Sequence, residues 1–219
     1  MPTLTIPARF TGPPDSANGG VTCGLLAQAT GLDEITLRLP PPLGRPLSLV
    51  DGSLYDGDAL VASAAVGAVE VVPPAPVSVK AAALATASYG GWSAHPFPTC
   101  FVCGPDKQDG LRVFPGRVAE GVVAAPWVPH DDGPVMDPVM VWAALDCPSG
   151  WSFDIVGRPM VLGRMTCRID ALPVAGEDHV LMGWQIGREG RKGFTGSALF
   201  TASGTLLARA QHTWIALSP

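Results

Sequence analysis

The stretch Pro138-Val-Met-Val-Trp-Ala-Ala-Leu-Asp-Cys-Pro148, which follows Asp137, contains one acid, Asp146, in an otherwise apolar run. Its ends predict a helix, because Asp137 is a favourable N-cap, Pro138 suits the first helical position and Pro148 is expected to end the helix. A buried carboxylate without a partner costs several kcal/mol. Asp146 must therefore face a cleft, be paired, or take part in function.

A similar helix is expected earlier in the chain, between Asn18 as N-cap and Gly31 as C-terminal stop. Both stretches are apolar on nearly all sides, which indicates helices that other structure surrounds. The segments that follow each of them are short, rich in Val, Leu and Ile, and bounded by turns, as strands are. The predicted strands are 34–39, 47–54, 59–72, 111–114, 121–126, 162–172, 179–187, 193–201 and 206–216.

The two halves repeat weakly, because Thr36-Leu-Arg-Leu39 is matched by Thr166-Cys-Arg-Ile169. We therefore expect an α+β chain in which an antiparallel sheet wraps round a central helix twice. The first unit is expected at 1–76, shortened relative to the second at 99–219. A linker at 77–98 would join them, with a short helix at 80–87, and the two units would pack as one body.

Composition limits the function. The 219 residues are 47% hydrophobic with a net charge of -5, so a packed core is expected and nucleic acid is not an expected partner. No apolar run is long enough to span a membrane, and an odd number of cysteines, five, argues against a disulfide framework. We expect a soluble cytoplasmic protein with reduced thiols.

Four motifs carry a resemblance to a known family: Cys100-Phe-Val-Cys-Gly-Pro-Asp-Lys-Gln-Asp-Gly-Leu111, Ala143-Ala-Leu-Asp146, Gly204-Thr-Leu-Leu-Ala208 with Trp214, and Ala17-Asn-Gly-Gly-Val-Thr-Cys-Gly24. With them the chain resembles hotdog-fold proteins of the PaaI-like acyl-CoA thioesterase group. The last motif looks like a degenerate second copy of the helix start. The resemblance covers most of the chain and implies a double hotdog.

In that family the central helix often begins with His-Gly-Gly and carries an acid nine residues after the His. Here Asp146 follows Asp137 by nine residues, so the second half keeps the acid and lacks the His. The first half keeps the glycine pair in Asn18-Gly19-Gly20 and has Ala27 in place of the acid. The resemblance implies one composite site, in which Gly19 and Gly20 N–H groups and Asn18 polarise a thioester carbonyl and Asp146 is nucleophile or general base.

Simpler interpretations remain for these residues. Asp146 could bond to the turn 147–150, Asn18 could be an ordinary N-cap, and Asp137 is best read as a cap. Cys147 is a weak candidate nucleophile, because no base lies near it in sequence.

Cys100 and Cys103 have the spacing of half a zinc site. No second Cys-x-x-Cys or His-x3–5-His pair exists, and His95, His130 or Cys147 could complete the site only through the tertiary structure. The sequence therefore predicts no metal and no cofactor.

The expected substrate is an acyl-CoA or another small thioester. Arg188, Arg191 and Lys192 flank a Gly-rich turn and could bind the phosphates of coenzyme A, or simply be a solvated hairpin. Trp142 could line an acyl pocket or belong to the core. A thioester hydrolase is the first hypothesis, a non-catalytic module that binds acyl-CoA or a lipid-like ligand is the alternative, and a hydratase is disfavoured because no His accompanies the acid. Two such chains could pair as a homodimer.

Overall fold

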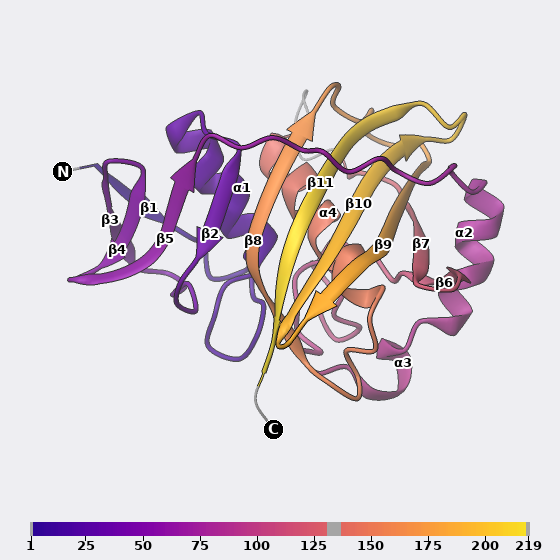
Figure 1. Cartoon of the computed structure of the whole chain (residues 1–219), viewed down its shortest axis with the longest axis horizontal. Coiled ribbons are helices and arrows are strands. Elements are labelled where there is room, and N and C mark those ends of the chain that lie inside the picture. The colour runs from indigo at the N-terminus through magenta and orange to yellow at the C-terminus, as the bar shows by residue number, and fades with distance from the viewer. Residues whose placement is uncertain (1, 131–136, 218–219) are drawn as a thin grey trace.

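A computed structural model describes residues 2–130 and 137–217. Its centre is one sheet of 11 strands in the order β1-β3-β4-β5-β2-β8-β11-β10-β9-β7-β6, and every neighbouring pair is antiparallel. The helices α1 (Gly19–Thr30) and α4 (Pro138–Trp151) pack side by side against one face of it (Figure 1). A large antiparallel sheet with few helices fits the predicted α+β class.

The first half supplies β1 Thr3–Thr5, β2 Glu34–Leu37, β3 Pro46–Val50, β4 Ser53–Asp56 and β5 Ala59–Ala65. The second half supplies β6 Gly116–Ala119, β7 Val122–Trp127, β8 Met160–Ile169, β9 His179–Glu189, β10 Lys192–Thr201 and β11 Leu206–Ala216. Between them lie α2 Val79–Ala85, the 3-10 turn η1 Thr86–Ser88 and α3 Gly91–Ala94. The halves join where β2 pairs with β8.

Both long helices begin as expected. The Asn18 side chain accepts a hydrogen bond from the Val21 N–H, and the Asp137 side chain accepts one from the Val139 N–H.

The prediction that α4 ends at Pro148 is wrong, because the helix continues to Trp151 with Pro148 inside it. Tertiary packing sustains this last turn, since its residues are buried and strand β9 approaches Pro148 closely through a glycine.

Three predicted strands differ from the structure. The segment 47–54 is a hairpin, because Asp51 and Gly52 both have positive φ (47° and 74°) and form the tight turn that this dipeptide favours. The segment 59–72 leaves the sheet after Ala65. The segment 111–114 is irregular because Arg112 has φ 56°, and the strand begins at Gly116 instead.

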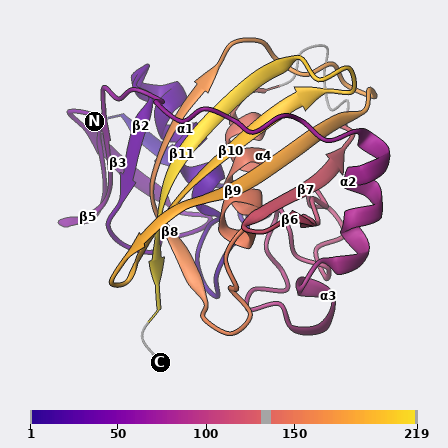
Figure 2. The ribbon, with the colours of Figure 1, turned by 45° about the vertical axis from the view of Figure 1, so that its right-hand side comes forward.

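The chain from Val66 to Ser78 crosses the sheet on the face opposite the two helices (Figures 1 and 2). Gln211 holds this crossing, because its side chain donates to the Ala68 carbonyl (2.9 Å) and accepts from the Glu70 N–H (3.2 Å). The crossing carries the chain from the first-half end of the sheet to α2 at the other end, where α2 packs against β6, β7 and β9.

The two helices approach one another at Gly20 and Gly24. A Cβ added to Gly20 would lie 2.6 Å from the Asp146 Cβ, and one added to Gly24 would lie 3.0 Å from the Val139 Cα. Real Cβ contacts are not that short, so these glycines let α1 pack closely on α4 and place the start of α1 beside Asp146. No helix in the described part of the chain is both long and apolar enough to cross a membrane.

Candidate functional site at the start of helix α1

Asp146 is 2% exposed and contacts the beginning of α1 directly. Its Oδ2 accepts hydrogen bonds from the Asn18 Nδ2 (3.1 Å) and from the Gly20 N–H (3.1 Å). Its Oδ1 has no hydrogen-bond partner among the described residues. One oxygen is therefore held in place, and the other is buried without a partner.

Asn18 does two tasks at this point. Its Oδ1 accepts from the Val21 N–H at 2.9 Å and caps α1, while its Nδ2 donates to Asp146. The unsatisfied N–H groups at a helix start favour a negative charge nearby. Asn18 and Gly20 therefore stabilise the ionised form of Asp146.

Burial opposes that stabilisation. Burial and the nearby Cys100 raise the pKa of Asp146 to about 7, and the hydrogen bonds from Gly20 and Asn18 act in the opposite direction.

The simpler interpretation of Asp146 as bonded to the turn 147–150 applies to its backbone only, because the Ser149 hydroxyl donates to the Asp146 carbonyl at 2.8 Å. The side chain bonds across to the other half of the molecule.

A small cavity and a larger groove meet beside this carboxylate. The cavity has a volume of about 50 Å³, and Asn18, Asp146 and Trp214 are among the residues that line it. The groove, about 400 Å³, is mostly apolar and is lined by Gly19 and Arg38 among others. Four residues line both: Pro13, Phe97, Val161 and Leu162. An apolar molecule in the groove would therefore end close to Asp146.

The backbone N–H groups of Gly19 and Gly20 differ in their hydrogen bonding. Gly20 donates its N–H to Asp146. This N–H is therefore not free to bind a substrate carbonyl, which is the role expected for it from the sequence. Gly19 lines the groove, and its N–H has no acceptor among the contacts of the described residues. The two glycines therefore have different surroundings, although they are adjacent in sequence.

Three thiols lie beside the acid, where the tertiary structure brings Cys147 to the pair Cys100 and Cys103. Sγ of Cys100 is 3.7 Å from Sγ of Cys147, and these two with Cys103 have all their sulfur atoms within 4.8 Å of one another. All three line the small cavity. The sequence offered two signals for this cluster, the Cys100-x-x-Cys103 spacing and the position of Cys147 next to Asp146 on an apolar helix.

The predicted substrate-binding residues lie farther out. The Arg188 guanidinium stacks on the Phe153 ring at 4.2 Å, and the Arg191 Nε donates to the Ala216 carbonyl at 3.0 Å, between the groove residues Ile215 and Leu217. Lys192 is exposed at the start of β10. The basic hairpin thus comes near the groove through Arg191.

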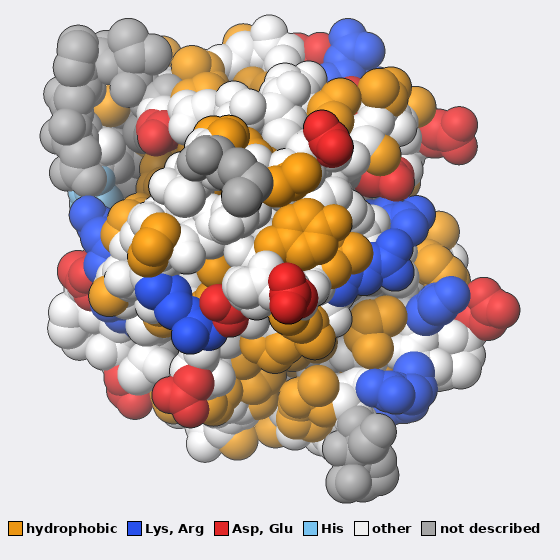
Figure 3. Space-filling view, turned by 90° about the vertical axis from the view of Figure 1, so that its left-hand side faces the viewer, with side chains coloured by type: hydrophobic (Ala, Val, Ile, Leu, Met, Phe, Trp, Pro, Cys, Tyr) orange, Lys and Arg blue, Asp and Glu red, His pale blue; other side chains and the backbone are white. Residues whose placement is uncertain are grey.

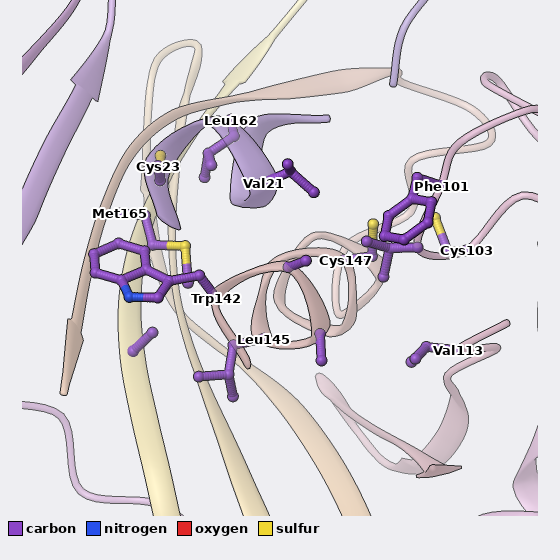
Figure 4. Close-up of a cluster of buried hydrophobic side chains, with 14 of the residues drawn as sticks. Val21, Cys23, Phe101, Cys103, Val113, Trp142, Leu145, Cys147, Leu162 and Met165 are labelled. Atoms are coloured by element: carbon purple, nitrogen blue, oxygen red, sulfur yellow. The ribbon is translucent and has the colours of Figure 1, made fainter. Parts of the chain in front are cut away.

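Trp142 is buried between the two helices. Figure 4 shows its indole ring on the side of α4 toward Cys23 and Met165, while Cys103 and Phe101 lie on the other side. The residues that line the cavity and the groove do not include Trp142. Its role as a substrate contact stays a prediction, and its packing favours a core residue.

Asp137 caps α4 and is exposed. The corresponding acid position on α1 is Ala27, which belongs to the core. Only the start of α1 therefore meets an acid from the other helix.

No protein-family model matches the chain, and no curated protein matches its sequence. Among solved structures, a putative thioesterase from Novosphingobium aromaticivorans is 16% identical and aligns over 99% of this chain and 95% of its own, with a TM-score of 0.66. A thioesterase superfamily protein is 17% identical over 67% of this chain and 70% of its own, with a TM-score of 0.50. A Streptococcus mutans protein bound to acetyl CoA is 12% identical over 48% of this chain and 87% of its own, with a TM-score of 0.44.

The similarity to the first two structures is a similarity of fold. The chain therefore has the hotdog fold of thioesterase superfamily proteins, which confirms the predicted resemblance at that level.

Proposed function

We propose that the chain is two hotdog units in tandem, 1–76 and 99–219, joined by the linker 77–98. Each unit would contribute one apolar helix and its own group of strands, and the pairing of β2 with β8 would merge them into one sheet. The contact between α1 and α4 then corresponds to the place where the resemblance puts the site.

At that contact the proposed reaction is hydrolysis of a thioester, with acyl-CoA as the substrate class. The observation that carries this proposal is the state of Asp146: Oδ2 is held by Asn18 and Gly20, Oδ1 is buried without a partner, and the residue lines a cavity that shares four lining residues with an apolar groove. A carboxylate fixed by one oxygen and unpaired at the other is suited to take a proton.

In the proposed step, a water molecule attacks the thioester carbonyl carbon while Asp146 Oδ1 accepts one of its protons. The carbonyl oxygen becomes an oxyanion, which the Gly19 N–H at the helix start can stabilise. The carbon–sulfur bond then breaks, the thiolate leaves with the proton from Asp146, and a carboxylic acid and a thiol are formed. Asn18 and Gly20 act as positioning residues for the carboxylate.

The groove suits an apolar acyl chain or the pantetheine arm, because most of its lining is aliphatic or Pro. The basic hairpin with Arg188, Arg191 and Lys192 is proposed to attract the phosphates of coenzyme A at its outer end. Trp142 is not needed for this arrangement.

A non-catalytic module that binds the same ligands is the second candidate. It is favoured by the small volume of the cavity, about 50 Å³, and by the near-complete burial of Asp146. In that case the groove would hold a ligand whose carbonyl never reaches the acid.

Release of free thiol separates the two candidates. The purified full chain is assayed with acyl-CoAs of different length and with matching N-acetylcysteamine thioesters, which lack the phosphates. We expect turnover of both classes with a lower KM for the CoA esters, and a loss of about 10²- to 10⁴-fold in kcat for Asp146→Asn, the range for removing a general base.

Asp137→Asn is the matched control, because it changes the other helical acid and keeps a good N-cap. Equal turnover in wild type and Asp146→Asn would refute the role of Asp146. Saturable acyl-CoA binding in the groove without thiol release would favour the module.

Pairing of two chains into a homodimer also remains a prediction, for which light scattering after gel filtration is the test. Figure 3 shows the face at the first-half end of the molecule, where hydrophobic side chains gather near the centre and basic and acidic ones lie beside them.

A further inference from the structure

The geometry points to a metal site in which the thiolates of Cys100, Cys103 and Cys147 hold one Zn²⁺ beside the Asp146 cavity. Two of these ligands come from the turn at 100–103 and the third from helix α4. The three ligands have no role in the proposed hydrolysis, although Asn18 donates to both Cys100 and Asp146 and the two sites share the small cavity.

The spacing of the sulfur atoms fits a tetrahedral metal. Zn–S bonds of about 2.3 Å at tetrahedral angles place two thiolate sulfurs about 3.8 Å apart. The Sγ atoms of Cys100 and Cys147 are 3.7 Å apart, and all three sulfurs lie within 4.8 Å of one another. A small inward movement of Cys103 would complete one face of a tetrahedron.

Nitrogen donors converge on these sulfurs. Cys103 Sγ lies 3.4 Å from the Trp151 Nε1 and 3.4 Å from the His95 Nε2. Cys100 Sγ accepts from the Asn18 Nδ2 at 3.7 Å. A neutral thiol is a weak acceptor, so this set of donors suits thiolates, which are the form that binds a metal.

His95 supports the sulfur and is not a metal ligand in this conformation. Its Nδ1 accepts a hydrogen bond from the Phe97 N–H at 2.8 Å, so the neutral ring carries its proton on Nε2, which faces Cys103. Within the described residues, no fourth ligand atom of a His, Cys, Asp or Glu lies within 4.8 Å of all three sulfurs. The fourth position would therefore open to the small cavity, where a water molecule can occupy it.

Charge balance supports a cation at this place. Asp146 and the three cysteines are buried together, and the ion pairs of the described residues include none of them. The Asp146 carboxylate therefore has no basic partner there, and a divalent cation would compensate its charge together with the charges of the thiolates that bind the metal. The metal would also tie the irregular segment before β6 to helix α4, which adds to folding stability.

Metal content of the purified full chain tests this inference. The protein is reduced, incubated with Zn²⁺, separated from free metal and assayed by elemental analysis. We expect one zinc per chain in the wild type and in Cys167→Ala, which removes a buried thiol on β8 outside the cluster. Cys147→Ala should lose the zinc while its circular dichroism is unchanged.

Cobalt substitution of the wild type gives a readout that does not depend on a variant. Three thiolates should produce a strong sulfur-to-cobalt charge-transfer band and the visible bands of a tetrahedral ion. Absence of bound zinc and cobalt in the reduced wild type would overturn the inference, as would a disulfide within the cluster in freshly isolated protein. Asp146→Asn should retain the metal, so a failure of the hydrolysis proposal and a failure of this one remain distinguishable.

Discussion

Helices α1 and α4 are similar in sequence character and contribute different groups to the candidate site. Both are apolar on nearly all sides, both begin at an Asn or Asp cap, and they pack against each other. Helix α1 contributes N–H groups and a glycine-lined surface, whereas α4 contributes the acid. In the proposed double hotdog the site is divided between the two helices, since α1 keeps the glycine pair and α4 keeps the acid.

The two halves of the chain also differ in their buried polar atoms that lack a hydrogen-bond partner. Those without a hydrogen-bond partner in the described residues are Trp127 Nε1, Asp146 Oδ1, Thr195 Oγ1, Ser197 Oγ, Arg209 Nε and both ring nitrogens of His212. All of them belong to the second half. Unpartnered buried groups are costly, so the second half is where stability is given up, and functional sites are often built at such places.

The largest expected effect is the difference in activity between Gly20→Ala and Gly24→Ala, which should lose similar amounts of stability. Gly20→Ala places a Cβ against Asp146, and we expect about 1–3 kcal/mol of destabilisation from overpacking and about 10²-fold lower thioesterase activity from displacement of the acid. Gly24→Ala meets Val139 and Trp142 instead. It should destabilise within the same range and keep most of the activity.

Urea unfolding and the thiol-release assay measure the two effects. If Gly24→Ala lost as much activity as Gly20→Ala at equal stability, the acid contact would have no special importance.

His212 should make the second half sensitive to acid. Burial lowers the pKa of His212 to about 3, from an ordinary value of 6.5. Its contribution to stability is therefore complete above pH 6.5 and is lost as the pH falls toward 3, because the unfolded chain then binds the extra proton. At pH 5 the loss is about 2 kcal/mol relative to neutral pH, from 1.36 kcal/mol per pH unit.

The comparison with His212→Leu isolates this group, since the other titrating residues contribute equally to both proteins. The unfolding free energy of the wild type should fall by about 2 kcal/mol relative to the variant between pH 7 and pH 5. Parallel curves for the two proteins would show that His212 is already satisfied in the folded state.

The smallest expected effect is the difference in stability lost when each helix cap, Asn18 or Asp137, is replaced by Ala. Asn18→Ala removes a helix cap and a donor to Asp146, so about 2 kcal/mol of destabilisation is expected. Asp137→Ala removes an exposed cap only and should cost about 1 kcal/mol. Thermal unfolding of both variants measures the difference, and equal losses would mean that Asn18 serves α1 alone.

Local signals in the sequence predicted much of this structure. The caps at Asn18 and Asp137 and the stop at Gly31 are short-range effects, and they appear as expected. Where tertiary packing overrides a local signal, prediction was wrong, as for Pro148 inside α4. The Asp51-Gly52 turn was a local signal that the prediction overlooked, so one strand was expected where the structure has a hairpin.

The candidate site was predictable only in part. The single acid in an apolar helix led to Asp146, and the resemblance added the nine-residue spacing, but nothing local shows that Gly20 bonds to it and Gly19 does not. The thiol cluster depends on Cys147 meeting the 100–103 turn, a contact between residues 47 positions apart. Such contacts follow from the complete fold, which a single sequence does not specify by pattern alone.

The central claim, a single site at the start of α1, is tested most directly by a crystal structure with a non-hydrolysable acyl-CoA analogue. The account predicts one analogue per chain, with its acyl or pantetheine portion in the groove, its carbonyl oxygen at the Gly19 N–H and its carbonyl carbon near Asp146. An analogue bound at the start of α4, or one whose carbonyl lies away from both Gly19 and Asp146, would contradict it.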